Sequence, residues 1–148
     1  MPFRWSGRDL QTLSAAAMSA LLLTSAAKHF REPEFFHQVV PDVLCRDDSG
    51  EQPNGPLAVL SREEWVAVSG LLEAAAAVGL LVPATRRAAA GCVTAMFAAF
   101  LSGHVDALLS AYGPEGTPRR RRVHTVRLPL QAPLIAWAWT LTRRTRRS

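Results

Sequence analysis

The chain has 148 residues, a length sufficient for one domain, and a formal net charge of +5. Hydrophobic residues make up 49% of it, and the charges gather between and beyond the apolar runs. This segregation argues against a soluble domain, whose charges would be spread along amphipathic elements, and predicts a small multi-span membrane protein. Because the arginines cluster beside apolar segments, we expect them to set topology and contact a lipid bilayer, not nucleic acid.

The first apolar segment covers about residues 10–27. A positive start, an Ala- and Leu-rich core and small residues near its end are also features of a cleaved signal peptide. However, Gln11, Thr12 and Ser14 are poor residues for a signal core, and three further apolar segments already require a membrane anchor. We therefore expect a retained transmembrane helix.

A polar loop, rich in proline and acidic residues, is predicted over about residues 30–63. The second helix is predicted over about 65–82, where Pro83 ends it, and the third over about 88–112. Together with the first segment, these helices predict at least three crossings of a membrane.

The fourth apolar segment covers about residues 126–142 and follows a basic connection. It contains Pro129 and Pro133 and is short for a span, since a helix rises about 1.5 Å per residue. It could borrow preceding residues, thin the bilayer locally or enter only partway. The overall prediction is an all-α, four-helix transmembrane bundle that forms one domain over residues 1–148.

The distribution of arginines bears on topology. If all four segments span and the N-terminus is cytoplasmic, Arg86, Arg87 and the C-terminal arginines lie inside, but the run Arg119 to Arg122 lies outside. That run breaks the positive-inside rule, whereas the inverted topology exports the other arginines. We predict both termini inside, because the acid-rich first loop then lies outside.

Glu73 is the one ionisable group in the apolar run over residues 65–82. A charged group near the centre of such a helix costs about 2.5–3.5 kcal/mol on insertion scales, so a chain that keeps one usually uses it or pairs it. Ser69 and Gly70 share its helix face by i−4 and i−3 spacing, and small residues there suit close packing in lipid. We expect Glu73 to point into the bundle, where it is hydrogen-bonded, paired with a basic group or facing a wet cavity.

Possible partners of Glu73 lie on the first and third helices. Ser25 and His29 share one stripe of the first helix; we expect Ser25 to reach the carboxyl and His29 to lie at the membrane edge. On the third helix, His104 and Asp106 point in different directions, and we expect both to be solvated in the interface. Counted from the turn at Pro83, Glu73 and His104 lie at different depths. No metal-ligand spacing such as H-E-x-x-H occurs, so no metal site is predicted.

Several short motifs follow one another along most of the chain. They are His29-Phe30 and Pro33 after the first helix, Ser69-Gly70-x-x-Glu73 in the second, Pro83-x-x-Arg86 after it, and Arg127-x-Pro129-x-Gln131 before a Trp-bearing last helix. This order resembles the DoxX-like family of small four-helix membrane proteins. The family often has a Pro-Ala-Asn-type element late in the third helix; here His104 stands in that region, so the role of the Asn is either absent or supplied by His104.

The resemblance implies a bundle in the bacterial cytoplasmic (inner) membrane. Some relatives are subunits of terminal quinol oxidase systems, and others associate with redox-stress enzymes. We therefore expect a non-catalytic accessory subunit that supports a membrane or peripheral redox or respiratory partner, with no cofactor of its own. Two alternatives stay open: a binder or carrier of a small lipophilic molecule such as a quinone, with Glu73 as the buried polar contact, or an intramembrane enzyme that uses Glu73 as acid or base.

Overall fold

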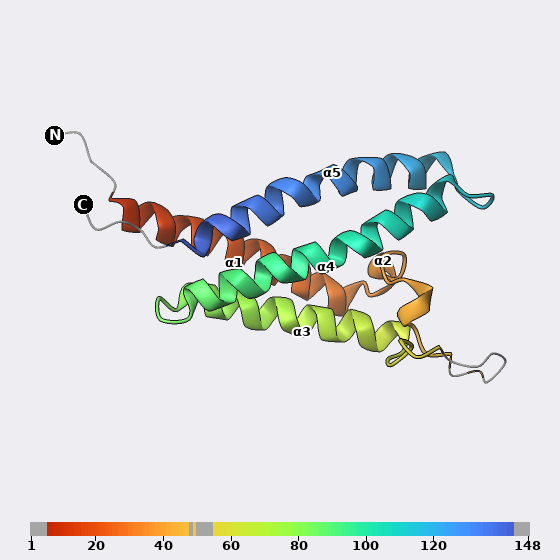
Figure 1. The fold of residues 1–148 in the computed structure, drawn as a ribbon, viewed down its shortest axis with the longest axis horizontal. Helices are drawn as coiled ribbons and strands as arrows, with labels where there is room; N and C mark the ends of the chain where they lie inside the picture. The colour runs from red at the N-terminus through yellow and green to blue at the C-terminus, as the bar shows by residue number, and fades with distance from the viewer. Residues whose placement is uncertain (1–5, 48, 50–54, 144–148) are drawn as a thin grey trace.

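Four long helices make up most of the computed structural model, which describes residues 6–47, 49 and 55–143 (Figure 1). They are α1 (Gly7–Arg31), α3 (Arg62–Leu81), α4 (Arg86–Tyr112) and α5 (Pro118–Leu141). The connection between α1 and α3 carries the short helix α2 (Glu34–His37) and the 3-10 helix η1 (Asp42–Leu44). The predicted all-α fold of four packed helices is therefore confirmed.

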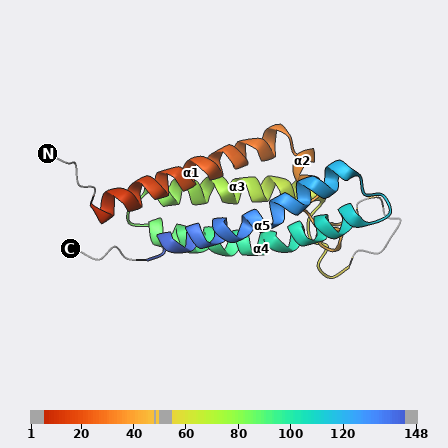
Figure 2. The same ribbon diagram turned by 90° about the horizontal axis from the view of Figure 1, so that it is seen from above.

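The helices pack mainly as two antiparallel pairs, α1 with α3 and α4 with α5, and α3 also contacts α4. Figures 1 and 2 show the start of α1, the end of α5 and the α3–α4 turn at one end of the bundle, which we call the terminal end. The α1–α3 connection and the α4–α5 turn lie at the opposite end, the loop end. The start of α1 and the end of α5 therefore lie at the same end of the bundle. Which end faces the cytoplasm stays a prediction.

Side-chain caps determine where the helices begin. Ser6 forms a capping box with Asp9 at the start of α1, and Ser61 forms another with Glu64 at the start of α3. These caps satisfy backbone amides that have no partner within the first turn of a helix. The helices consequently begin earlier than the apolar runs that predicted them, at residues 7 and 62.

Helix α5 begins at Pro118 and not near residue 126, so the expected basic connection is helical. Thr117 accepts a hydrogen bond from the amide of Arg120, and proline is favoured at the first helical position. Arginine is also a good helix former. With 24 residues, α5 is about 36 Å long, more than the thickness of a bilayer core.

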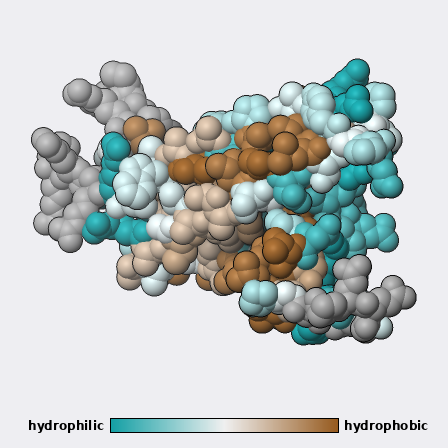
Figure 3. All heavy atoms as spheres, turned by 45° about the vertical axis from the view of Figure 1, so that its right-hand side comes forward, coloured by the Kyte–Doolittle hydropathy of each residue, from teal (hydrophilic) through white to brown (hydrophobic). Residues whose placement is uncertain are grey.

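Three helices of the described chain, α1, α3 and α4, are long and apolar enough to cross a membrane. The fourth expected span is not among them, because α5 carries Arg119 to Arg122 and Arg127. Figure 3 shows apolar side chains over the middle of one face and hydrophilic ones toward both ends. Large exposed apolar side chains on the three helices include Leu13, Leu23, Leu71, Val78 and Leu109, as expected of a surface that faces lipid.

A core of mostly small and aliphatic side chains holds the four helices together toward the terminal end. It consists of Ala15, Met18, Leu22, Ala77, Leu80, Ala90, Val93, Phe97, Ala138 and Leu141. Small residues let helix backbones approach one another closely, which favours association in lipid. The two helix pairs are therefore in tight contact over this half of the bundle.

Pro83 and Arg86 lie where α3 turns into α4. Arg86 is buried, and its Nε donates a hydrogen bond to the carbonyl of Leu80 at 2.9 Å, while its Nη1 donates to the Thr12 hydroxyl at 3.2 Å. The last carbonyls of a helix have no partner within it, so Arg86 satisfies one of them and ties α1 to the turn. These two motif positions thus have structural roles.

Gly70 allows α1 and α3 to meet closely beside Glu73. A Cβ atom at Gly70 would lie 2.8 Å from the Cβ of His29 and 3.1 Å from the ring of Phe30. The first distance is shorter than side chains tolerate, so the helices could not keep this separation with a larger residue. Gly70 therefore fixes how near His29 lies to the face of α3 that carries Glu73.

We predict that Gly70→Ala lowers the unfolding free energy by about 1–3 kcal/mol, because the added methyl forces α1 and α3 apart. Gly91→Ala on α4 is the matched control, since a Cβ there meets nothing within 4 Å. The control should leave stability unchanged or raise it by up to about 1 kcal/mol, as alanine favours helix. Thermal unfolding midpoints of both variants in detergent measure the effect. Equal midpoints for the two variants would contradict the close contact.

Candidate functional site

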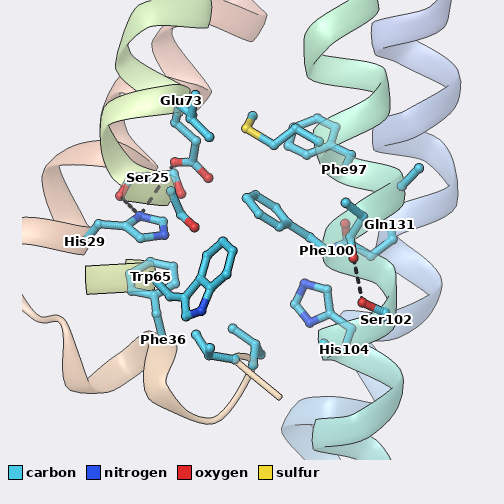
Figure 4. A pocket seen from close by; sticks show the side chains of 18 of the residues that line it. Ser25, His29, Phe36, Trp65, Glu73, Phe97, Phe100, Ser102, His104 and Gln131 are labelled. Atoms are coloured by element: carbon cyan, nitrogen blue, oxygen red, sulfur yellow. Dashed lines mark hydrogen bonds and ion pairs between the residues drawn. The ribbon is translucent and has the colours of Figure 1, made fainter. Parts of the chain in front are cut away.

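A cavity of about 830 Å³ lies between the two helix pairs, from the middle of the bundle toward the loop end. Its volume falls within the range of about 300–1,000 Å³ that is typical of small-molecule sites. The walls are mostly apolar, and Figure 4 shows four aromatic side chains around the space: Phe36, Trp65, Phe97 and Phe100. The cavity thus has the size and lining of a site for a lipophilic molecule.

Glu73 contributes a buried carboxyl to this cavity. The residue is 3% exposed, and its side chain points from α3 toward the space between the walls (Figure 4). The Ser25 side chain lies beside the carboxyl, and both residues line the cavity (Figure 4). One carboxyl oxygen, Oε2, is buried and has no hydrogen-bond partner among the described residues.

His29 lies beside Glu73 without satisfying that oxygen. Its Nδ1 is 3.6 Å from Oε2, which is too far for a hydrogen bond. The same nitrogen lies 2.9 Å from the backbone carbonyl of Ser25, and because a carbonyl only accepts, Nδ1 donates its proton there. The nearest basic neighbour of Glu73 is therefore already engaged with backbone.

His29 lies near the end of α1, and its burial was not predicted from the sequence. It is 5% exposed, and its ring stacks on that of Phe36, with centroids 3.6 Å apart and planes inclined by 16°. The cause is α2, which folds back over the end of α1 and covers the imidazole. The sequence gives no sign of this fold-back, because it depends on the path of the loop.

His104 and Gln131 lie on the opposite wall (Figure 4). His104 was expected to be solvated, but it is 7% exposed, and its Nδ1 has no hydrogen-bond partner within the described part of the chain. Asp106, two residues on, is exposed and lies outside this cavity. The cavity therefore has unsatisfied buried polar atoms on both walls, Glu73 Oε2 on one and His104 Nδ1 on the other.

The remaining motif residues divide between the cavity and packing. Those that line the cavity are Ser69, Arg127 and Gln131. Those with packing or turn positions are Phe30 beside Gly70, Pro33 before α2, Pro83 in the α3–α4 turn, Arg86 at the start of α4 and Pro129 within α5.

The sequence reasoning missed the aromatic wall. Phe97, Phe100 and His104 follow i, i+3, i+7 spacing and therefore share one face of α4. That spacing was the available signal for a buried His104. Trp65 had no such signal, since it begins the apolar run of α3 and could equally have been a residue of the membrane interface.

The sequence profile of a family described as "Domain of unknown function (DUF8561)" matches residues 18–142, which is most of the chain. The chain belongs to this family. No curated protein and no solved structure matches it. The match covers α3, α4, α5, the part of α1 from residue 18 onward, and all residues that line the cavity, so the site is part of the DUF8561 domain. The matching profile is not that of the DoxX-like proteins. The similarity to them in the order of motifs stays a resemblance.

The segment with α2 and η1 closes the DUF8561 cavity at the loop end. Val39, Val40, Pro41 and Leu44 of this segment line the space. Arg62 holds the segment in place: its Nη1 donates to the carbonyls of His37 and Val40 at 2.6 and 2.8 Å, and its Nη2 contacts the Asp42 carboxylate. The Trp65 indole also donates to the Leu44 carbonyl at 2.8 Å.

We predict that Arg62→Gln loosens this closing segment. The variant loses charge-assisted hydrogen bonds, each of which contributes about 1.5–3 kcal/mol, so amide exchange over residues 39–45 should accelerate by about tenfold or more. Arg31→Gln is the control, because Arg31 is exposed at the end of α1 and forms no hydrogen bond or ion pair with the described residues of the segment. Hydrogen exchange followed by mass spectrometry measures both. Unchanged protection in Arg62→Gln would show that Arg62 does not hold the segment.

Proposed function

We propose that this protein is a membrane-embedded binder of a small lipophilic molecule, which occupies the cavity and places a polar group against Glu73. The observation that carries the proposal is the buried carboxyl of Glu73, which lines the cavity and whose Oε2 has no hydrogen-bond partner among the described residues. Buried polar atoms are nearly always satisfied, and an unsatisfied one costs about 1–3 kcal/mol. A hydroxyl group on a bound molecule would donate a hydrogen bond to the carboxyl, and a carbonyl group would accept one from its protonated form.

The character of the walls favours a lipophilic molecule over water alone. An ordered buried water needs two to four polar partners, but aromatic and aliphatic side chains supply most of the surface near Glu73. A molecule with an apolar body buries against these rings and still offers one polar atom to the carboxyl. A quinone is one molecule of this kind.

The membrane setting follows from the three candidate spans and their exposed apolar side chains. We propose that the helices cross the cytoplasmic membrane with both chain ends on the inner side. A lipophilic molecule would then reach the cavity from the bilayer, where such molecules concentrate.

The contacts of Glu73 also bear on the two other roles, catalysis and support of a redox partner. An acid or base needs a second group to exchange its proton with, yet the Nδ1 proton of His29 is donated to the Ser25 carbonyl. The geometry therefore favours binding over catalysis. An accessory role beside a redox partner is supported by the DoxX-like order of motifs and is compatible with binding a quinone; stoichiometric co-purification of such a partner would test it.

We predict that Glu73→Leu removes at least about nine-tenths of the lipophilic molecule that co-purifies with the protein, because a hydrogen bond to a buried acid is lost. Glu63→Leu is the matched control, since Glu63 is exposed in the first turn of the same helix. Native mass spectrometry and lipid extraction of the gently solubilised proteins measure the content.

The same variants separate binding from a purely structural role. If Glu73 only bridges helices, Glu73→Leu should lower the unfolding temperature and leave the bound content unchanged, and that result would refute the proposal. If it binds a ligand, the ligand-free variant should be at least as stable as ligand-free wild type, because an unsatisfied buried carboxyl has been removed.

A further inference from the structure

The wall opposite Glu73 carries a half-buried cation, Arg127, that forms no ion pair with an acidic residue of the described chain. Arg127 lines the cavity and is half-buried, with its guanidinium 4.9 Å from the ring centroid of Phe35. The ion pairs within the described ranges are formed by Lys28, His29, Arg46 and Arg62, and none of them includes Arg127. A charge removed from water is costly unless it is paired and hydrogen-bonded.

The ionisable neighbours of Arg127 are also basic. The charged groups that act on His104 are Arg127 and His124, and those that act on His124 are Arg127 and Arg120. His104 and His124 are 7% and 2% exposed, and each has a buried Nδ1 with no hydrogen-bond partner among the residues that the structure describes. His124 is held behind the wall by a 3.2 Å contact between its Nε2 and the Gln38 side-chain oxygen.

Glu73 does not neutralise this group of basic side chains. It belongs to the other wall, on α3, and its ion-pair neighbour is His29. The two walls therefore differ in charge: one carries the Glu73 carboxyl, and the other carries Arg127 and His104, with no carboxyl among its lining residues. Gln131 adds an amide to the same side.

We propose that the bound molecule is a lipophilic carboxylic acid whose carboxylate binds Arg127 and His104. Its apolar body lies along the aromatic wall, and a hydroxyl or carbonyl group on that body meets Glu73. The planar fork of a guanidinium matches a carboxylate and binds it through two parallel hydrogen bonds. This inference rests on the proposed function and adds the charge and position of the ligand's second polar group.

Tryptophan quenching tests the acid end by itself. The probes are 9,10-dibromostearic acid and its methyl ester, which share the same chain and differ only in the carboxylate. Trp65 lines the cavity, so a probe inside quenches its fluorescence, and the quenching that disappears in Trp65→Phe reports the cavity. The full chain in detergent should bind the acid at least about tenfold more tightly than the ester.

Variants of Arg127 test whether this side chain causes the preference for the acid over the ester. Arg127→Gln should weaken binding of the acid by at least about tenfold and leave the ester unchanged, while Arg127→Lys keeps part of the preference. Arg122→Gln is the control, because Arg122 is exposed on the same helix. Retained ester binding shows that the cavity of a variant is intact, and the wild-type preference for acid over ester is a test that needs no variant.

Two outcomes overturn the inference in distinguishable ways. Equal quenching by acid and ester in the wild type refutes the carboxylate site but leaves a lipophilic ligand in place, whereas no Trp65 quenching by either probe refutes the proposed function as well. Brominated phosphatidylglycerol is the third probe. If it quenches Trp65 in an Arg127-dependent manner and the acid does not, the anionic group is a phospholipid head group and the carboxylic acid is wrong.

Discussion

Burial of the Glu73 carboxyl is the constraint on which the arrangement of this bundle depends. A carboxyl deep among apolar helices must find polar partners or remain unsatisfied at a cost. Ser25 lies beside the carboxyl (Figure 4), and His29 lies close but donates its proton to backbone. The carboxyl lines the cavity, and its Oε2 has no hydrogen-bond partner among the residues that the structure describes.

The two halves of the bundle are packed differently. Toward the terminal end, alanines and aliphatic side chains bring all four helices together, and Arg86 ties the α3–α4 turn to α1. Farther along, aromatic side chains hold the two helix pairs apart, and the segment with α2 and η1 closes the resulting space. A packed half next to an open half forms the cavity without a ligand, as is usual for small-molecule sites.

Much of the fold followed from the sequence, because long apolar runs and the residues that interrupt them predict helices directly. The inward direction of Glu73 also followed, since the small residues on its face require a neighbouring helix. The start of α5 did not, because its arginines suggested a loop while Thr117 and Pro118 form a helix start. The prediction relied on apolar content and therefore missed the capping residue Thr117 and the proline at the first helical position.

The second half of the site needed the tertiary structure. Counting along straight helices put His104 and Glu73 at different depths, but both line one cavity that extends along the bundle. Burial of His29 depended on α2 folding back over it, and the importance of Arg127 depended on which neighbours it lacks. The shared cavity, the burial of His29 and the surroundings of Arg127 all depend on contacts between residues that are distant in sequence. Local sequence patterns do not predict such contacts.

The most direct test of this account is an experimental structure of the full chain in lipid nanodiscs, at a resolution that shows bound molecules. The account predicts non-protein density between the helix pairs, in contact with the Glu73 carboxyl and with the wall that carries His104. A closed bundle without that space, or a Glu73 side chain that faces lipid or hydrogen-bonds fully to protein groups, would contradict it.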